Sequence, residues 1–554
     1  MRILVSACMA VLLAGCASTA KRSADADVLQ GTAEPWASEA IYFVITDRFV
    51  NGDGSNDHRD QGGTHPTFGL PLAPCNGVQA NIGYMGGDFA GLLGSANYIR
   101  GMGFTAVWIT PIVDNPDEAF TGGDEITCTS FLSDRGKAGY HGYWATSFHK
   151  VDEHWPSEGL GFAELTQGLR EKGLKTVLDI VGNHTSPGYT MPEPQPGFGQ
   201  LFDARGKLVA DHQNLPPERL DPNNPLHAFY NTKRDLAQLA DLNADNPAVM
   251  KLLVDAYLKW IDEGAAAFRV DTIRHQPLAF WKTFADRIRK KHPGFFMFGE
   301  AYDYDAANIA PFTQPENGAY SVLDFPLRQA MVDVFGDKQM GYERLGEALF
   351  LEGGPYRNVY ELMTFYDNHD MPRMQATNEG FIDAHNWLFT ARGIPVIYYG
   401  SEMGFSRGRA EHAGNRNYFG PHNIALAQSH PIQAHLSTVA RARQTFASLQ
   451  RGVQWNLQLD GDHAAFYRVL EDADDGEIAL VLLNKSDEVH DFKIDQHVQP
   501  GRWRDGITGK SRLVDPGRPF GVSVEPHGVA IWVRKGRIDD RAWVDALRAR
   551  MPKP

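Results

Sequence analysis

The chain has 554 residues, of which 43% are hydrophobic and 22% are charged. This length exceeds one ordinary domain and suffices for a large barrel with an accessory module, and the composition excludes an intrinsically disordered chain. The formal net charge of -15 disfavours binding to nucleic acid and to anionic lipid headgroups, whereas neutral polymers remain suitable partners.

The N-terminus predicts an export signal. A basic residue precedes a short apolar stretch at 3–13, which is too short to cross a bilayer as a stable helix. The letters LAGC at 13–16 resemble the cleavage box of bacterial lipoproteins, in which the cysteine becomes the lipidated first residue. The alternative is an ordinary secretory signal with an incidental cysteine. We expect a signal peptide at 1–16 and a flexible tether at 17–37, with the protein exported to the periplasm or cell envelope and lipid-anchored at Cys16.

Two further observations concern the membrane. The residue after the cysteine is alanine rather than aspartate, which by resemblance favours the outer membrane. No later stretch is long and apolar enough for a membrane helix, so we expect the lipid anchor to be the only contact with a membrane.

Eight short apolar runs, each followed by a helical pattern, predict buried parallel strands. They lie at 41–45, 106–109, 176–181, 266–270, 295–298, 322–325, 362–365 and 395–399. One intervening helix has clear end signals, because Asn246 can cap it, Pro247 suits its first position and Gly264 can end it. Strands that alternate with helices predict an α/β fold, a (β/α)8 TIM barrel at 38–184 and 245–430.

Two segments depart from this alternation. Residues 185–244 are rich in proline, glycine and asparagine and hold no strong helical pattern, which predicts a large excursion after the third strand. Short β runs after about residue 430 predict a C-terminal antiparallel β-sandwich at 431–536. A tail follows at 537–554, with a helical pattern at 539–550.

Two cysteines lie outside the predicted signal, Cys75 and Cys128. A pair of thiols in an oxidising compartment predicts one disulfide that closes a long loop. Two unrelated buried cysteines are the alternative, and surroundings rich in glycine and proline favour the bridge.

Polar residues gather at the predicted C-terminal ends of the strands, which is where such barrels place catalytic groups. Asp271 follows the fourth strand, Glu300 the fifth and Asp370 the seventh. A lone carboxylate in such a place is usually a helix cap or a solvated loop residue. Three of them, flanked by histidine and arginine, indicate a functional cluster, because clustered carboxylates repel one another and are costly to desolvate.

This grouping suits glycoside cleavage, which needs one carboxyl group to protonate the leaving oxygen and another to act at the anomeric carbon. Arg269 lies two residues before Asp271 on the same side of the strand, so its charge would keep Asp271 ionised as a nucleophile. Glu300 then becomes the acid/base, and Asp370 can stabilise the developing oxocarbenium charge. Two histidines are placed to hydrogen-bond sugar hydroxyls, namely His184 and His369.

Six segments resemble signature regions of the α-amylase family, glycoside hydrolase family thirteen. They are YHGYW (140–144), DIVGNH (179–184), LADLN (239–243), FRVDTIRH (268–275), FGEA (298–301) and FYDNHD (365–370). They stand in family order, which makes the resemblance very specific. It implies a barrel, a B domain inserted at 185–244, a β-sandwich C domain and a double-displacement mechanism that retains the anomeric configuration.

Carried over position by position, the resemblance implies Asp271 as nucleophile, Glu300 as acid/base and Asp370 as stabiliser. It implies that the ring of Tyr143 stacks on the sugar at the cleavage point. Ten positions match residues that contact the substrate: His141, Tyr143, Trp144, His184, Arg269, Arg274, His275, Tyr302, His369 and Arg416.

The resemblance also implies structural calcium at one or two sites. The glycine-rich loop at 51–57 offers oxygen ligands of the kind that calcium prefers, although a solvated turn explains the loop alone. Six positions match a calcium site of the cyclodextrin glucanotransferases: Asn51, Asp53, Asn56, Asp57, Gly86 and Asp88. A second site would join the B domain to the barrel through Asn183, Thr232, Asp241 and His275.

The motifs most resemble those of cyclodextrin glucanotransferases and bacterial α-amylases, and three departures favour hydrolysis. Ala237 stands where the glucanotransferases carry a central aromatic residue that guides cyclisation. The chain ends before their extra C-terminal domains, one of which binds starch. His412 and Arg274 replace an aspartate and a lysine, respectively.

We therefore expect an α-amylase-like hydrolase that cleaves α-1,4-glucosidic bonds of starch or maltodextrins. The alternatives within the family are a cyclomaltodextrinase, a maltogenic amylase and a 4-α-glucanotransferase. A non-catalytic carbohydrate-binding protein is the alternative from another class, and the presence of all three carboxylates argues against it.

Overall fold

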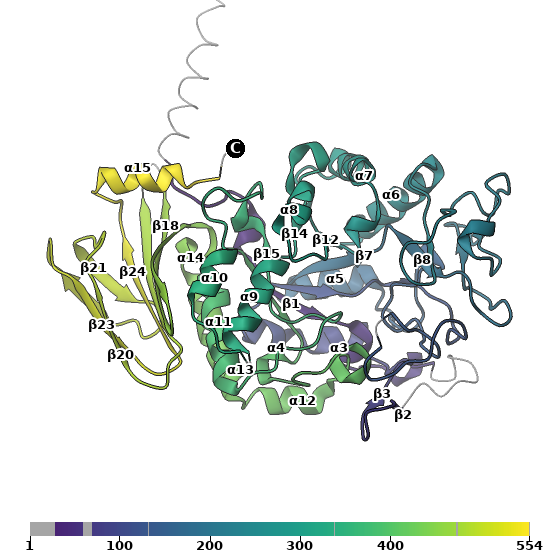
Figure 1. Cartoon of the computed structure of the whole chain (residues 1–554), viewed down its shortest axis with the longest axis horizontal. Helices are drawn as coiled ribbons and strands as arrows, with labels where there is room; N and C mark the ends of the chain where they lie inside the picture. The colour runs from purple at the N-terminus through teal and green to yellow at the C-terminus, as the bar shows by residue number, and fades with distance from the viewer. Residues whose placement is uncertain (1–27, 59–68, 131, 337, 473–474, 553–554) are drawn as a thin grey trace, which may run out of the picture.

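The computed structural model of the chain describes residues 28–58, 69–130, 132–336, 338–472 and 475–552. Figure 1 shows a central barrel, with a layer of C-terminal strands on one side and the segment around β8 on the other. The predicted signal peptide and its Cys16 lie outside the described residues. Within the described part of the chain, we find no helix with the length and apolar character needed to span a bilayer.

Eight parallel strands form the central sheet in the order β14-β13-β12-β7-β4-β1-β16-β15. Their bounds are β1 Ile41–Val44, β4 Ala106–Ile109, β7 Lys175–Ile180, β12 Ala267–Val270, β13 Phe296–Gly299, β14 Ser321–Val322, β15 Met363–Thr364 and β16 Ile394–Tyr398. A parallel bridge between Leu323 and Met363 joins the two outer strands, so that the sheet closes into a barrel. Each of the eight predicted apolar runs overlaps one of these strands, which confirms the predicted barrel.

Helices cover the outside of the barrel. The principal ones are α3 Phe89–Gly94, α4 Ala96–Gly101, α5 Phe162–Glu171, α6 Pro247–Asp262, α7 Leu278–Lys291, α9 Phe325–Phe335, α11 Asn378–Thr390 and α13 Pro431–Thr445. The others are α2 Thr46–Phe49, α8 Ala306–Ile309, α10 Glu343–Ala348, α12 Gly420–Ala427 and α14 Ala447–Arg451. All residues of β1, β4, β12 and β13 are buried, because one face meets the barrel interior and the other meets this helical layer.

The helix α6 illustrates how local sequence sets these boundaries. The side chain of Asn246 accepts a hydrogen bond from the backbone N–H of Ala248, and Pro247 occupies the first turn. Gly264 follows the helix with φ of 107°, a left-handed conformation that favours glycine. The predicted end signals of this helix are confirmed.

Between β7 and α6 the chain makes the predicted excursion with little regular structure. Its strands are β8 His184–Pro187, β9 Gln200–Phe202, β10 Leu208–Asp211 and β11 Leu239–Asp241. The antiparallel pairing of β11 with β8 sets Asp241 opposite His184, which fixes this excursion to the rim of the barrel.

Two small two-stranded sheets lie in the connections that follow β1 and β4. Their strands are β2 Leu70–Pro71, β3 Gln79–Ala80, β5 Val113–Asp114 and β6 Ser147–Val151. A disulfide joins Cys75 to Cys128, with their Cα atoms 6.1 Å apart, and confirms the predicted bridge.

The C-terminal strands form a sandwich of a six-stranded sheet, β17-β18-β19-β24-β21-β22, and the pair β20-β23. Their bounds are β17 Val453–Asp460, β18 His463–Glu471, β19 Gly476–Asn484, β20 His490–Ile494, β21 Gly501–Asp505, β22 Ser511–Val514, β23 Phe520–Val524 and β24 Gly528–Lys535. All pairings are antiparallel, as predicted. The helix α15, Arg541–Ala549, lies across one end of these strands and lies within the predicted helical tail (Figure 1).

The start predicted for this sandwich, residue 431, is wrong. Residues 431–451 form α13 and α14, and the first strand begins at Val453. The helix α13 packs against α11 in the helical layer of the barrel. Its Arg443 donates hydrogen bonds to the carbonyl oxygens of Ala37 and Gly393, so this helix belongs to the barrel.

The prediction of a flexible tether at 17–37 is wrong for residues 28–37. Leu29 is fully buried and pairs with Glu471, through backbone hydrogen bonds of 2.7 and 2.8 Å. Trp36 stacks on Phe296 with ring centroids 5.4 Å apart. Polar composition dominated the prediction, but two large apolar side chains suffice to dock this segment on the folded protein. The rest of the predicted tether, 17–27, lies outside the described residues.

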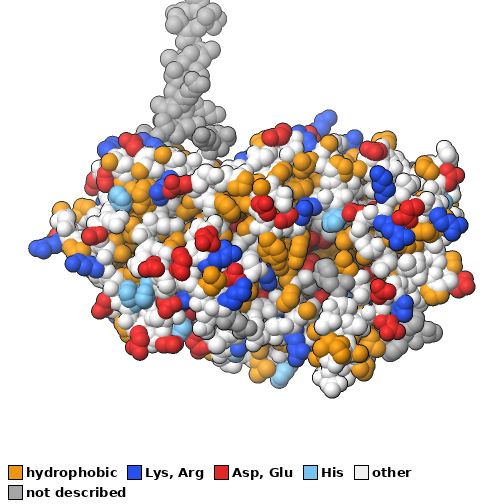
Figure 2. Space-filling model, in the orientation of Figure 1, with side chains coloured by type: hydrophobic (Ala, Val, Ile, Leu, Met, Phe, Trp, Pro, Cys, Tyr) orange, Lys and Arg blue, Asp and Glu red, His pale blue; other side chains and the backbone are white. Residues whose placement is uncertain are grey.

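The surface carries both signs of charge. On the face shown in Figure 2, acidic and basic side chains are interspersed, and no large patch is basic alone.

Candidate active site

A cavity of about 300 Å³ lies at the C-terminal ends of the barrel strands. All three predicted catalytic carboxylates line it, namely Asp271, Glu300 and Asp370. Nine of the predicted substrate-contacting residues line it too: His141, Tyr143, Trp144, His184, Arg274, His275, Tyr302, His369 and Arg416. The tenth, Arg269, is fully buried and contacts the carboxylates. We call this cavity the cleft.

One guanidinium organises the carboxylates. Nη1 of Arg269 lies 2.7 Å from Oδ1 of Asp271, and Nη2 lies 2.9 Å from Oε2 of Glu300. Nη1 also lies 2.9 Å from Oδ1 of Asp179, a buried residue of β7. The predicted contact between Arg269 and Asp271 is present, and the arginine contacts two further carboxylates as well. One fixed positive charge therefore faces three carboxyl groups.

Two of these three buried acids have raised pKa values. Burial raises the pKa of Glu300 to about 8, while Arg269 opposes the rise and neighbouring carboxylates add to it. Burial likewise raises the pKa of Asp179 to about 7. A carboxyl group that holds its proton near neutral pH suits general acid catalysis.

The turn after β12 aims backbone and side-chain donors at the same acids. Thr272 has φ of 46°, a left-handed conformation that is rare for a β-branched residue. In this conformation its hydroxyl donates to Oδ2 of Asp271 at 3.1 Å and its N–H donates to Oε2 of Glu300 at 3.4 Å. Strained residues of this kind concentrate at functional sites.

Asp370 has its own partners. Nη2 of Arg416 lies 2.7 Å from its Oδ1, and Nε2 of His369 lies 3.2 Å from its Oδ2. Burial raises the pKa of Asp370, and Arg416 opposes that effect. Burial holds the pKa of His369 well below its usual range, so this imidazole stays neutral and can hydrogen-bond uncharged partners.

Tyr143 closes the network between these groups. Its hydroxyl donates to Oδ2 of Asp179 at 2.8 Å and lies 3.0 Å from Nε2 of His369. Its ring stacks on that of His369, with centroids 5.5 Å apart.

Burial lowers the pKa of His184 to about 4, and its Nδ1 is a buried atom with no hydrogen-bond partner among the described residues. A neutral ring with an unpaired nitrogen suits contact with a sugar hydroxyl.

Sequence reasoning missed several residues of the site. Asp179 contacts Arg269 beside the cleft and carried a signal, because it is a charged residue inside an apolar run. Glu411, Lys137 and Asp134 line the cleft but lie in connections between strands and helices, without any pattern that marks them. The residue counted as the replacement for an aspartate, His412, is buried, whereas its neighbour Glu411 forms the ion pair with Arg416 at 3.0 Å.

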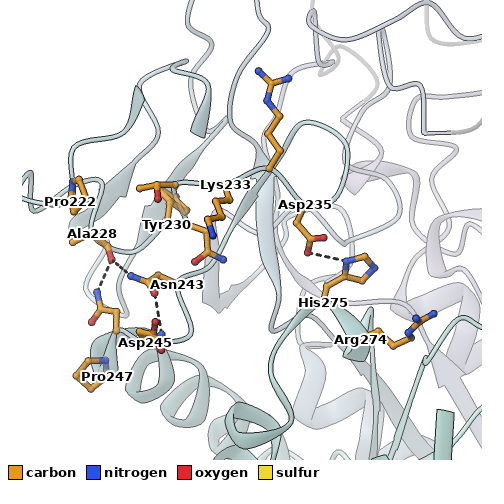
Figure 3. Close-up of a pocket in the computed structure, with 14 residues that line it drawn as sticks. Pro222, Ala228, Tyr230, Lys233, Asp235, Asn243, Asp245, Pro247, Arg274 and His275 are labelled. Carbon is orange, nitrogen blue, oxygen red and sulfur yellow. Dashed lines mark hydrogen bonds and ion pairs between the residues drawn. The ribbon is translucent and has the colours of Figure 1, made fainter. Parts of the chain in front are cut away.

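A larger cavity of about 820 Å³ shares Arg274 and His275 with the cleft. Figure 3 shows Asp235 and His275 pointing toward each other, and their Oδ2 and Nδ1 atoms are 2.9 Å apart. Thr232, one of the predicted calcium positions, lines the same cavity.

The predicted calcium residues near this cavity include unpaired oxygen atoms. Both amide atoms of Asn183 and Oδ1 of Asp241 are buried without a hydrogen-bond partner in the described structure. Burial raises the pKa of Asp241 to about 8, with an added effect from Asp235. Orphaned oxygens of this kind are costly, and they fit the donor set of a hard cation.

The residues of the other predicted calcium site are only partly gathered. Asn51 and Asp57 lie together, and a Cβ built on Gly86 would fall 2.4 Å from an oxygen of Asp57, so only glycine fits there. Oδ1 of Asn56 is buried and unpaired within the described structure, as a cation ligand could be. By contrast, two carboxylates accept backbone N–H groups as caps, Asp53 before a single turn and Asp88 before α3.

The catalytic-domain model of the α-amylase family matches residues 43–435. The chain therefore belongs to the α-amylase family, whose enzymes generally bind structural calcium.

The relatives include transferases and hydrolases. A cyclomaltodextrin glucanotransferase of Niallia circulans is 32% identical over 395 residues, which cover 69% of this chain and 51% of that protein. A β/α-amylase of Paenibacillus polymyxa is 30% identical over 464 residues, or 81% of this chain and 34% of that protein. The chain thus spans about half the length, or less, of these curated relatives.

Solved structures match along most of the chain. The cyclomaltodextrin glucanotransferase CldA, with a three-domain ABC distribution, has a TM-score of 0.71 and 30% identity, and the match covers 90% of this chain and 99% of that one. An α-amylase of Anoxybacillus has a TM-score of 0.69 and 25% identity, covering 91% and 99%. Because CldA has only three domains, the expectation that a short C-terminal region argues against transferase activity is wrong.

Proposed function

We propose that the protein is a retaining glycoside hydrolase that cleaves α-1,4-glucosidic bonds in starch and maltodextrins. One observation carries the proposal. The buried guanidinium of Arg269 contacts both Asp271 and Glu300. Asp370 lines the same cleft and contacts Arg416 and His369. The cleft thus places Asp271, in contact with a fixed positive charge, beside a carboxyl group whose pKa burial raises, and double displacement needs a nucleophile and an acid so placed.

The reaction runs in two steps. In the first, an oxygen of Asp271 bonds to the anomeric carbon while Glu300 gives its proton to the glycosidic oxygen, which leaves with the aglycone. In the second, Glu300 takes a proton from water, the water oxygen bonds to the anomeric carbon and the bond to Asp271 breaks. Asp370 faces the positive charge that develops on the glycone ring in both steps.

Product analysis tests this proposal. Digestion of maltoheptaose should release the α-anomer first, as read by proton NMR before mutarotation, because two displacements retain the configuration. The β-anomer as first product would contradict the mechanism. A heat-denatured sample serves as the control.

The relatives favour a second candidate, a 4-α-glucanotransferase, because several of them are cyclomaltodextrin glucanotransferases. Ala237 argues against it, because this residue lines the cleft with a single methyl group where the glucanotransferases carry the aromatic residue that guides cyclisation. We expect linear oligosaccharides from soluble starch, and cyclodextrins as the main early products would establish the second candidate instead.

We also propose a structural calcium ion between the excursion at 185–244 and the barrel. Oxygens of Asn183 and Asp241 would hold it, together with carbonyls near Thr232 and His275. The unpaired buried oxygens support it. The ion would neutralise Asp241 and tie β8 and β11 to the rim. The site at the 51–57 loop is only partly gathered. We propose a second ion there because Asn56 has an unpaired buried oxygen among the described residues, Asp57 lies beside Asn51, and only glycine fits at position 86.

Calcium removal should therefore destabilise the fold. Free calcium at 100 times its Kd should add about 2.7 kcal/mol to the free energy of unfolding relative to EGTA. Differential scanning calorimetry measures this as a higher Tm, and Asp241→Asn should reduce the difference. An equal Tm in calcium and EGTA would refute the site.

We further propose export with a lipid anchor at Cys16, supported by the LAGC letters at 13–16. In cells, Cys16→Ser should abolish incorporation of labelled fatty acid and move the protein from the detergent phase to the aqueous phase of a Triton X-114 partition. Cys8→Ser is the matched control. If the Cys16 variant partitions as the unaltered protein does, the lipid anchor is refuted, and an ordinary secretory signal is the remaining interpretation.

A further inference from the structure

Five charged side chains of alternating sign form a continuous chain along the cleft. They are Asp134, Lys137, Glu411, Arg416 and Asp370, and all five line the cleft. The successive N–O distances are 2.6, 3.0, 3.0 and 2.7 Å. The proposed function already uses Asp370 and its partner Arg416, so the other three require an explanation of their own.

The central link of this chain joins two loops that are far apart in sequence. Lys137 lies in the connection that follows β4, and Glu411 lies in the connection that follows β16. Their side chains are 7% and 13% exposed, so the ion pair is largely shielded from solvent. Nζ of Lys137 also lies 5.9 Å from the ring centroid of Trp144, another residue of the cleft. The pair thus joins the connections that follow β4 and β16, the two strands that flank β1.

The part of the cleft beside Glu300 is built differently. The side chains of Arg274 and His275 are 39% and 33% exposed, and Tyr302 is 43% exposed. Two of these residues also line the neighbouring cavity of about 820 Å³ (Figure 3). In the ring of eight strands, β13 lies opposite β1 and β12 lies opposite β16. The cleft is therefore open on the Glu300 side and walled by buried charges on the other.

The chemistry of cleavage determines which end of a bound glucan lies on which side of the cleft. The acid/base must reach the glycosidic oxygen that leaves with the aglycone, whereas the stabilising carboxylate faces the glycone ring. The open side next to Glu300 accordingly receives the aglycone. The walled side, where Arg416 contacts Asp370, receives the glycone.

We propose that the Lys137–Glu411 ion pair is a barrier that ends the glycone side of the cleft and so limits the length of the released oligosaccharide. This inference rests on the proposed glycosidase function and adds to it the determinant of product length. A bound glucan would have to separate two largely shielded, mutually paired charges to extend further, which costs their attraction without a new partner for either charge. The enzyme should therefore release short maltooligosaccharides from long chains.

The test compares products of maltoheptaose and soluble starch from the full chain and from Lys137→Ala. Removal of the lysine side chain opens the barrier, so the ratio of maltotetraose and longer products to maltose should rise on the order of tenfold. Lys137→Arg keeps the ion pair and should retain the short products. Lys150→Ala is a matched control, because Lys150 pairs with Asp114 at 2.6 Å on the exposed surface and should leave product lengths unchanged.

Lys137→Ala leaves two carboxylates without their cation, and the fold is checked by its Tm. If this variant fails to fold, the double variant Lys137→Ala with Asp134→Ala, which removes a paired positive and negative charge, takes its place. Unchanged product lengths in a folded variant would overturn the proposal. So would a lower kcat/KM on long maltodextrins with unchanged products, since Lys137 would then bind sugar. Absence of any cleavage by the unaltered enzyme would instead refute the glycosidase function.

Discussion

Replacing Asp271 by asparagine is expected to lower kcat on maltodextrins by about four orders of magnitude or more, since an amide cannot form the covalent glycosyl intermediate. The fold should survive, because asparagine has nearly the same shape and Arg269 keeps its contacts with Asp179 and Glu300. Reducing-sugar assays at saturating maltoheptaose measure the loss, and calorimetry monitors the fold.

A matched aspartate provides the control for this variant. Asp303 lies in the loop after Glu300 and pairs with Arg274 at 2.9 Å near the surface. Asp303→Asn changes the same functional group close to the cleft and should keep kcat within about threefold, as expected for a weak surface pair. Asp271→Asn with full activity, or an equal loss in both variants, would contradict the assignment of the nucleophile.

Replacing Glu300 by glutamine should lower kcat/KM on maltodextrins by about 10²–10⁴-fold, because the leaving oxygen loses its proton donor. Cleavage of α-maltosyl fluoride should suffer much less in its first step, since fluoride leaves without protonation. The ratio of the two losses separates an acid role from general damage to the cleft. Equal losses on both substrates would count against Glu300 as the acid.

The pH profile gives an independent reading of the same group. The pKa of Glu300 is raised by burial to about 8, and the first step needs its protonated form. Activity should therefore persist through neutral pH and fall as pH rises through that pKa, in kcat/KM of the unaltered enzyme. In Glu300→Gln this alkaline limb should vanish from the residual activity on the fluoride. A limb that stays in place would belong to another group.

The sequence predicted the elements that obey a local rule. Buried parallel strands read as apolar runs, so all eight were located to within a few residues, and the ends of α6 followed from Asn246, Pro247 and Gly264. Failures arose where composition competed with packing. The segment around Leu29 and Trp36 was predicted as a tether, although these two side chains dock on the folded protein. Helix α13 was assigned to the sandwich because its contact with α11 is not encoded nearby.

What the sequence by itself determined was the barrel, the three carboxylates at its strand ends, the contact between Arg269 and Asp271, and the family resemblance that the comparisons confirm. These features depend on periodicity and on neighbours along one strand. Only the tertiary structure decided that the same arginine also faces Glu300, and that Lys137 and Glu411 meet at one side of the cleft. The physical reason is that ion pairs between loops depend on where the barrel brings those loops together, and a loop's own residues carry no period that could reveal its partner.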